Sequence, residues 1–411
     1  MPRTIIACAR LVTCDAARAT LADPLGTIED AAILLDGPLI TAVGPAAELR
    51  GRYPEARSIV APGVITPGLV DAHTHAPWMG SRDAEYALRM SGAGYEAIAA
   101  AGGGIVASMR AVRASTPAAM ADALRARLLR MASLGVTTVE AKSGYGLDEA
   151  SERKQLEAVA EASRADDLPR VVATYLALHA LPPEAGGDRA AYAARVAAEW
   201  LPGIAAAGLA VFVDAYVDRS AFSVADARPV LRRARELGLG VRLHAGQFAD
   251  VGAAELAAEL GAASADHLEQ IGLPGIEAMA RAGVRAVLLP VASFTLRQDP
   301  PPVAALRAAG VPLVVASDAN PGTAPTESLP LALALAVRSY GLSVAEALLG
   351  ATREAAASLG LAATTGVLRE GLAADLVLWD LPHERAVLQP WGLSRARCTL
   401  RAGAVIAGHL S

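Results

Sequence analysis

Two histidines stand one residue apart, at His73 and His75, directly after a short apolar run. Residues i and i+2 of a β-strand point to the same face, so both imidazoles are expected to project to one side. Two neutral imidazoles aimed at one point form half of a zinc or iron site. One such pair is a weak indicator by itself. Asp71 just before it and Pro67-Gly68 at the entry of the run favour the metal interpretation.

Histidines recur at comparable places further along the chain. The sequence has seven, and five of them follow the C-terminal ends of apolar runs: His73, His75, His179, His244 and His267. A single histidine at a strand end is more often a hydrogen-bonded structural residue. In β/α barrels, however, catalytic groups gather at the C-terminal ends of the strands, so five histidines on one rim indicate a functional site.

Asp318 follows the last apolar run, Leu313–Ala316, and has two interpretations. It could be an ordinary turn or helix-capping residue ahead of Asn320-Pro321-Gly322. In a closed barrel, however, the first and eighth strands are neighbours, which would place Asp318 beside His73 and His75. There its carboxylate would bind a metal ion and accept a proton from the bound water.

His244 would complete a ligand set of three histidines and one carboxylate. His267 would remain a non-ligand that hydrogen-bonds a substrate carbonyl or the attacking water. The stretch 211–218, expected as the fourth strand, has no lysine, which would be the usual support for a second metal ion. We therefore expect one divalent ion, and these ligands suit Zn²⁺ and Fe equally.

The elements that must position these residues repeat one rhythm from residue 64 to about 322: a β-branched run, a polar turn and an Ala/Leu/Arg-rich helix. In the helical stretch Ala121–Leu134, for example, Leu124, Leu128 and Met131 fall at i, i+4 and i+7. Such alternation predicts parallel strands joined by right-handed crossovers. Eight units favour a closed (β/α)₈ barrel, although an open doubly wound sheet has the same local pattern. The eight apolar runs are Val64–Asp71, Val136–Glu140, Val171–Leu178, Val211–Val217, Val241–Leu243, Ser264–Leu268, Val284–Leu289 and Pro312–Ala316.

Both flanks are instead rich in short strand-like pieces separated by Gly, Pro and Asp turns. We expect residues 1–63 and 366–411 to form one composite β-sandwich domain around a catalytic barrel spanning 64–365. The expected pieces are Thr4–Val12, Ala31–Leu35, Leu39–Val43, Gly366–Glu370, Ala374–Asp380 and Cys398–Gly408.

Composition excludes several classes of protein. Hydrophobic residues make up 53% of the 411 residues and charged residues 19%, which excludes a disordered chain. Lys142 and Lys154 are the only lysines and the net charge is −5, which argues against nucleic-acid binding. The three cysteines, Cys8, Cys14 and Cys398, have no metal-binding spacing and fit a reducing compartment. With no apolar run of about 18 residues, we expect no membrane span and a cytoplasmic location.

Taken together, these residues resemble the amidohydrolase superfamily, and within it the chain is similar to the imidazolonepropionase family. The resemblance covers nearly the whole chain. It implies hydrolysis of a small molecule, 4-imidazolone-5-propanoate, to N-formimidoyl-L-glutamate in histidine degradation, and a homodimer as a family-level expectation. The motifs that carry it are Pro67–His75, Gly80–Asp83, Ala101–Ile105, Glu140–Leu147, Ser264–His267 and Asp318–Thr323.

The resemblance also implies roles for individual residues. His73, His75, His244 and Asp318 would hold the metal ion, and Asp318, His267 and Gln247 would serve catalysis. Arg82 matches the arginine that pairs with the propionate carboxylate, which suits a bidentate guanidinium. Residues matching those that contact the imidazolone are Tyr145, His179 and Gln247, and those matching contacts to the product are Asn320, Gly322 and Thr323.

The segment after Pro325 matches the family pattern poorly, and three single places depart from it. Gln247 stands where many members have Glu, Ala292–Thr295 replaces a Gly-containing, Tyr-rich stretch, and Asp218 ends a strand that favours Cys-Glu. Two alternatives therefore stay open. One is another amidohydrolase that acts on a cyclic amide, an amidine or a nucleobase-like substrate. The other is a non-catalytic barrel that serves as a scaffold or binding protein.

Overall fold

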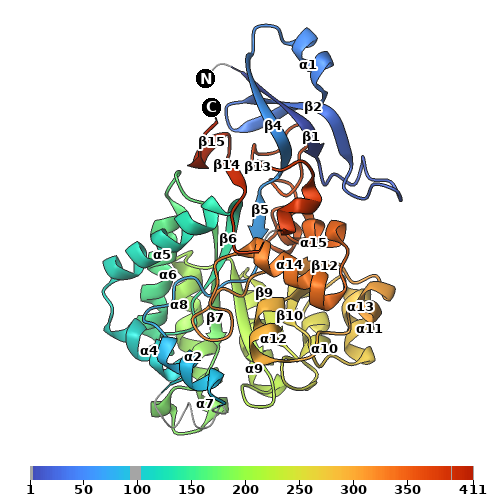
Figure 1. The fold of residues 1–411 in the computed structure, drawn as a ribbon. Coiled ribbons are helices and arrows are strands. Elements are labelled where there is room, and N and C mark those ends of the chain that lie inside the picture. The colour runs from blue at the N-terminus through green and yellow to red at the C-terminus, as the bar shows by residue number, and fades with distance from the viewer. Residues whose placement is uncertain (1–2, 93–102, 390, 411) are drawn as a thin grey trace.

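The computed structural model describes residues 3–92, 103–389 and 391–410, and within them the strands form two sheets (Figure 1). The larger is an eight-stranded sheet in which consecutive strands pair in parallel, as the alternating pattern predicts. Each of the eight expected runs contributes to a strand. These are β5 (Leu69–Asp71), β6 (Val136–Lys142), β7 (Arg170–Leu178), β8 (Phe212–Val217), β9 (Gly240–Ala245), β10 (Ser264–His267), β11 (Arg285–Leu288) and β12 (Leu313–Val315).

Main-chain contacts just beyond the first and last strands bring the two ends of this sheet together. Thr74 and Ala319 form an isolated parallel bridge. The Asp318 amide donates to the His73 carbonyl at 3.0 Å, and the His75 amide donates to the Ala319 carbonyl at 2.9 Å. The sheet therefore closes into a barrel, and the open doubly wound alternative is excluded.

Helices cover the outside of the barrel because each presents an apolar stripe to the strands. Leu124, Leu128 and Met131 of α5 are fully buried, as their spacing predicts, and belong to one core cluster with Val136 and Val139 of β6. The helices are α2 (Asp83–Met90), α4 (Ile105–Ala114), α5 (Pro117–Ser133), α6 (Glu149–Ser163), α7 (Arg189–Arg195), α8 (Leu201–Ala206), α9 (Val224–Glu236), α10 (Ala253–Glu259), α11 (Leu273–Ala282), α12 (Pro290–Leu296), α13 (Val303–Ala308), α14 (Leu329–Tyr340), α15 (Val344–Gly350) and α16 (Arg353–Ser358). Among the described residues, none of these helices combines the length and apolar character needed to cross a membrane.

The second sheet combines strands from both ends of the chain, as the strand-like flanks predict (Figure 1). Its order is β15-β14-β13-β4-β1-β2-β3, and α1 (Ala46–Arg52) packs beside it. Leu39 also bridges to Ala373, and Ile40 donates to the Leu372 carbonyl, so the sheet curls over one apolar cluster. Its strands are β1 (Thr4–Val12), β2 (Thr27–Asp36), β3 (Leu39–Pro45), β4 (Arg57–Pro67), β13 (Leu376–Trp379), β14 (Ala396–Arg401) and β15 (Ala404–Gly408).

Two expected strands differ from the structure. The run Val64–Asp71 is divided at Gly68, so its first half pairs with β1 and β13 in the terminal sheet and only β5 enters the barrel. A Cβ at Gly68 would lie 2.1 Å from the Thr137 hydroxyl, which explains why glycine stands at this crossing. Gly366–Glu370 is described but forms no strand; it is a turn whose Leu368 amide donates to the Thr13 carbonyl.

The terminal sheet packs against the N-terminal ends of the barrel strands. The Trp379 ring lies close to Gly135, just before β6, and its indole donates to the Thr66 hydroxyl at 2.8 Å. At the start of β7, Arg170 pairs with the buried Asp375 at 2.8 Å. The opposite, C-terminal ends of the strands carry the five clustered histidines.

Candidate active site

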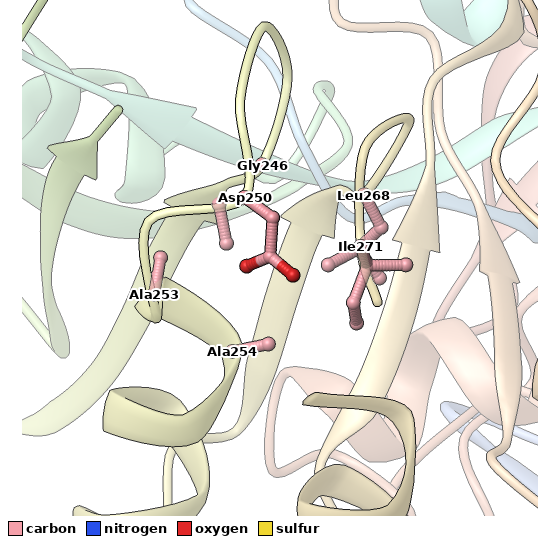
Figure 2. A pocket seen from close by; sticks show the side chains of 7 residues that line it. Gly246, Asp250, Ala253, Ala254, Leu268 and Ile271 are labelled. Carbon is pink, nitrogen blue, oxygen red and sulfur yellow. The ribbon is translucent and has the colours of Figure 1, made fainter. Parts of the chain in front are cut away.

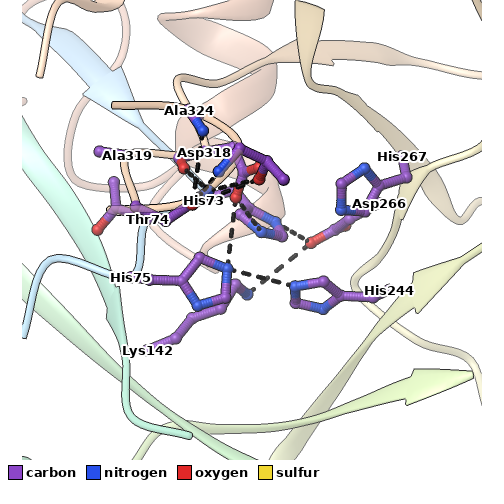
Figure 3. Close-up of polar contacts among 12 residues, drawn as sticks. His73, Thr74, His75, Lys142, His244, Asp266, His267, Asp318, Ala319 and Ala324 are labelled. Atoms are coloured by element: carbon purple, nitrogen blue, oxygen red, sulfur yellow. Dashed lines mark hydrogen bonds and ion pairs between the residues drawn. The ribbon is translucent and has the colours of Figure 1, made fainter. Parts of the chain in front are cut away.

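Three histidine rings face one another at the C-terminal end of the barrel (Figure 3). His73 and His75 come from the segment after β5, and His244 comes from β9. Their potential ligand atoms all lie within 4.8 Å of one another, and all three residues are buried. The bridge that closes the barrel brings Asp318 to the same point.

The spacing of these donors fits one tetrahedral ion. The Asp318 Oδ1 is 3.4 Å from Nε2 of His73 and 3.3 Å from Nε2 of His75, and the Nε2 atoms of His75 and His244 are 3.5 Å apart. Two donors about 2.0–2.1 Å from a tetrahedral zinc are roughly 3.3–3.4 Å apart. Nε2 of His73 and Oδ1 of Asp318 are moreover buried without a hydrogen-bond partner. The donor set therefore fits a single divalent metal ion.

Carboxylates behind the rings orient them for this task. Asp266 Oδ2 is 2.6 Å from Nδ1 of His73, and Asp214 Oδ2 is 3.0 Å from Nδ1 of His244. A carboxylate at Nδ1 holds a proton there and leaves the Nε2 lone pair for a metal. Burial and the Lys142 charge act to lower the pKa of His73, but its contacts with Asp266 and Asp318 prevail and raise it to about 9. This environment favours a positive charge between the two aspartates.

A buried cation lies beneath the site and was not identified from the sequence as a functional residue. Lys142 has no solvent exposure, and its Nζ is 2.7 Å from Glu140 and 2.8 Å from Asp214. Arg242, also fully buried, lies 3.7 Å from Asp266. Burial acts to lower the pKa of Lys142, but the charges of Asp214 and Glu140 keep it above its ordinary value. The i and i+2 spacing of Glu140 and Lys142 repeats that of His73 and His75, and this signal could have revealed the pair.

Two site residues have a left-handed backbone, which is uncommon for residues other than glycine. Asp318 has a φ of 56° and His267 a φ of 80°. Burial acts to raise the pKa of Asp318, but contacts with His73 and His75 bring it well below its ordinary value. Asp318 is therefore held as a carboxylate in a strained turn directed at the histidines.

His267 borders the cluster, as its position at the end of β10 predicts. Its ring centroid lies 5.5 Å from that of His244 and 6.0 Å from that of His73. It is not part of the group of three histidines that could hold a metal within the described residues. This placement suits a group that acts beside the ion.

Tyr145 and His179 line one side of the cluster. The His179 ring stacks on His75 at 5.3 Å, and the Tyr145 ring lies 5.1 Å from His179. Nδ1 of His179 is 2.8 Å from the Gly144 carbonyl. Burial together with the neighbouring His75 and His244 lowers the pKa of His179 well below its ordinary value, so this ring is neutral.

Gln247 lies on the loop after β9, and its Oε1 accepts a hydrogen bond from the Tyr216 hydroxyl at 2.8 Å. The structure also shows where Asp218 and Ala292–Thr295, two other departures from the family pattern, lie. Asp218 accepts a hydrogen bond from the Phe248 amide at 2.9 Å and so anchors the loop that carries Gln247. Ala292–Thr295 lies in α12, where Ser293 donates to Glu269 at 2.6 Å. These residues therefore shape the rim of the barrel.

Arg82 lies at the start of α2 and is held by Glu85, a residue the sequence reasoning missed. Two guanidinium nitrogens donate to Glu85 at 2.7 and 2.5 Å, and Arg89 shares the same carboxylate at 2.6 Å. The guanidinium lies against Gly322, where a Cβ would come within 2.4 Å of it. The i, i+3 spacing of Arg82 and Glu85 was a signal for this pair.

The loop after Asp318 is ordered by its own side chains. Asn320 donates to the Asp318 carbonyl at 2.6 Å and accepts from the amides of Gly322 and Thr323 at 2.8 and 2.7 Å. The structure therefore gives Asn320 a part in shaping the turn that presents Asp318 and Gly322. Of the motif Ala101–Ile105, residues 101 and 102 lie outside the described residues. Gly104 donates to Glu85 at 2.8 Å.

A separate small hollow lies behind the ends of β9 and β10 (Figure 2). Its walls are mostly aliphatic, and its one charged group, Asp250, already accepts hydrogen bonds from Gly252 at 3.3 Å and Gly272 at 2.9 Å. Asp250 therefore fastens two loops together, and the hollow offers no chemistry. Its lining residues are Ala245, Gly246, Asp250, Ala253, Ala254, Leu268 and Ile271.

Comparison with known proteins gives consistent matches. The model of the amidohydrolase family matches residues 64–405, and that of an imidazolonepropionase-like composite domain of bacteria matches residues 31–56. An imidazolonepropionase of Acidiphilium cryptum is 48% identical over 381 residues, which is 92% of this chain and 93% of that relative. One of Xanthomonas oryzae pv. oryzae is 44% identical over 403 residues, or 98% of each chain.

Solved structures with a similar fold are more distant in sequence. A triazine hydrolase variant superimposes with a TM-score of 0.79 at 21% identity, covering 99% of this chain and 95% of its own. An adenosine deaminase from Xanthomonas campestris with bound zinc gives 0.73 at 21% identity, covering 98% and 92%. At this identity the likeness establishes the fold alone.

Proposed function

The chain belongs to the amidohydrolase family and, within it, to the imidazolonepropionases, and from this premise we propose how its site performs the reaction. The reaction is hydrolysis of a carbon–nitrogen bond that opens 4-imidazolone-5-propanoate to N-formimidoyl-L-glutamate. The observation that carries the proposal is the donor set of His73, His75, His244 and Asp318 in a chain this similar to imidazolonepropionases over nearly its whole length.

The metal ligands are assigned to the three histidines through Nε2 and to Asp318 through Oδ1. Zn²⁺ or Fe²⁺ fits this set, because both accept imidazole and carboxylate ligands. When bound, such an ion supplies Lewis-acid chemistry, polarising an oxygen and lowering the pKa of water toward about 7.

The residues around the ion move the protons. Asp318 accepts the proton of the attacking water, which the position of its Oδ1, 3.4 Å from Nε2 of His73 and 3.3 Å from Nε2 of His75, supports. His267 hydrogen-bonds either the ring carbonyl or that water. The proton then returns to the ring nitrogen, and the carbon–nitrogen bond breaks.

Substrate recognition is assigned to the rim. Arg82 pairs with the propionate carboxylate, and Glu85 holds its guanidinium in place for that contact. Tyr145, His179 and Gln247 surround the imidazolone ring, while Asn320, Gly322 and Thr323 contact the opened product. The neutral, stacked His179 ring suits contact with a flat heterocycle.

The test combines metal analysis with turnover of 4-imidazolone-5-propanoate by the purified protein. We expect one divalent ion per chain and release of N-formimidoyl-L-glutamate. Turnover of a nucleobase or another cyclic amide in preference to imidazolonepropanoate would replace this function with that of a different amidohydrolase. Absence of turnover with a fully loaded site would favour a non-catalytic barrel.

A further inference from the structure

A buried carboxylate, Glu269, lies two residues beyond His267 in the turn between β10 and α11. Its side chain has no solvent exposure, and its Oε2 is 3.7 Å from Nδ1 of His267. Both of these atoms are buried without a hydrogen-bond partner. A buried carboxylate oxygen and a buried ring nitrogen are each costly to leave unpaired, so a small adjustment that pairs them is favourable.

The second oxygen of Glu269 fixes the direction of this carboxylate. Ser293 on α12 donates its hydroxyl to Oε1 at 2.6 Å, and the hydroxyl of Tyr340, at the end of α14, lies 2.5 Å from the same serine oxygen. A serine has one hydroxyl proton, so Tyr340 is the donor to Ser293. Burial and the nearby Glu269 hold the pKa of Tyr340 well above its ordinary value, which keeps the phenol a donor.

Proton positions are therefore ordered from Tyr340 through Ser293 to Glu269, which leaves Oε2 to accept a hydrogen bond from His267. The two nitrogens of an imidazole point in different directions. A ring whose Nδ1 faces Glu269 therefore turns Nε2 away from it, while its centroid stays 5.5 Å from that of His244. Carboxylates that fix the tautomer of a catalytic histidine in this way are known in other hydrolases.

We propose that Glu269 is a positioning residue that holds His267 with its proton on Nδ1, so that the Nε2 lone pair accepts a hydrogen bond from the attacking water. This inference rests on the proposed hydrolytic function and decides between the two roles open to His267. A neutral ring without a proton on Nε2 cannot donate to the substrate carbonyl from that nitrogen. Asp318 and His267 are then the acceptors for the two hydrogens of the water.

The test is a nitrogen-15 NMR spectrum of the zinc-loaded protein with labelled histidine. Zinc is diamagnetic, and the chain has seven histidines, so the His267 signals can be identified by their loss in His267→Gln. We expect Nδ1 of His267 to carry the proton in the unchanged protein. A proton on Nε2 would overturn the proposal without any variant of Glu269.

Glu269→Gln sharpens the test because it keeps the size of the side chain and reverses the hydrogen bond. The glutamine oxygen still accepts from Ser293, so its amide group turns to His267 and imposes the opposite tautomer. We expect the proton to move to Nε2 and kcat to fall by about 10²-fold or more, the scale of a lost acid–base contact. KM and metal content should stay unchanged, a split that general loss of structure would not give.

The matched control is Glu277→Gln, the same change on α11, where the side chain is 65% exposed. It should alter neither the tautomer nor kcat. Should Glu269→Gln fail to fold, Ser293→Ala frees the carboxylate more gently, and we expect a kcat loss of a few-fold with partial mixing of the two tautomers. An unchanged tautomer in both variants would overturn the proposal.

These spectra need no substrate, so the two failures are distinguishable. A protein that shows the expected tautomers but does not open imidazolonepropanoate keeps the role of Glu269 and loses the proposed function. A protein that opens imidazolonepropanoate with the proton on Nε2 keeps the function and loses the role of Glu269.

Discussion

The N-terminal and C-terminal ends of the barrel strands differ in the surroundings of their polar groups. At the N-terminal ends, the terminal sheet covers the strands, and two polar contacts stabilise this region: the Trp379 indole donates to Thr66, and Arg170 of β7 pairs with Asp375. At the C-terminal ends, buried atoms of His73, His267 and Asp318 lack hydrogen-bond partners. Stability and chemistry are thus separated along the same strands, as in other barrels of this class.

This separation means that a change at the C-terminal ends should affect activity without stability, and a change at the N-terminal ends should affect stability without activity.

The largest effect should come from removing the metal ion. We expect about one ion per chain, complete loss of turnover on chelation, and recovery with zinc or ferrous iron. Metal analysis and an activity assay measure this. Two ions per chain, or full activity after exhaustive chelation, would contradict the mononuclear site.

Lys142→Met should break the separation, because Lys142 lies at the C-terminal end of β6 and yet pairs with two carboxylates buried inside the barrel. Its loss leaves Glu140 and Asp214 buried without their cation, which should cost about 3–5 kcal/mol of stability. Since Asp214 orients His244, metal affinity should fall as well. Denaturant unfolding and metal titration measure the two losses. Stability near that of the unchanged protein would mean that Arg242 alone compensates these carboxylates.

Asp318→Asn should affect the C-terminal end alone. Asparagine keeps one coordinating oxygen but cannot accept the proton of the water, so kcat should fall by about 10²-fold or more. Most of the bound metal and the unfolding midpoint should be retained. Near-normal turnover with full metal occupancy would transfer the role of base to another group, His267 first.

Arg82→Ala should lower kcat/KM for imidazolonepropanoate by roughly 10- to 200-fold, since a desolvated pair of arginine and carboxylate contributes about 1.5–3 kcal/mol. Metal content should not change. The control is an imidazolone without the carboxylate, which should be a poor substrate and almost indifferent to the change. Equal losses for both substrates would show that Arg82 supports the fold.

Trp379→Phe should have the smallest effect. It acts at the N-terminal ends of the barrel strands. It removes the indole hydrogen bond to Thr66 and part of the contact with Gly135, which should cost about 1–3 kcal/mol of stability. The value of kcat should stay unchanged in a folded sample. A loss of turnover without a loss of stability would mean that the two ends are coupled.

Much of the fold could be predicted because the strand and helix periods differ. The stripe of Leu124, Leu128 and Met131 identified a helix, and each β-branched run contributed to a strand. Two errors came from long-range effects. In the run from Val64 to Asp71, Pro67-Gly68 was interpreted as the entry of one strand, whereas it divides two strands that pair with distant partners. Gly366–Glu370 has strand-like residues but no neighbouring strand with which to pair.

The candidate site could be predicted where the residue type alone indicates a chemical role. Histidines after strands were noticed, and closure of the barrel brings Asp318 to His73 and His75. The charges behind them were not given roles, because a lysine or glutamate in a strand is usually a surface residue. Only the closed barrel turns Lys142 and Glu140 inward. The assigned roles of these residues in binding and catalysis stay predictions until the variants are measured.

The contacts between the ends of β5 and β12, which close the barrel, also determine at what stage of synthesis the site can form. Their partners are far apart in the chain: Asp71 accepts hydrogen bonds from Ser317, 246 residues later. During synthesis the ribosome has released His73, His75 and His244 well before Asp318 is made. A nascent chain therefore holds an incomplete set of donors, and the fourth arrives only when β12 closes the barrel. Completion of the donor set is thereby tied to closure of the barrel, and a product truncated before Asp318 lacks the fourth donor.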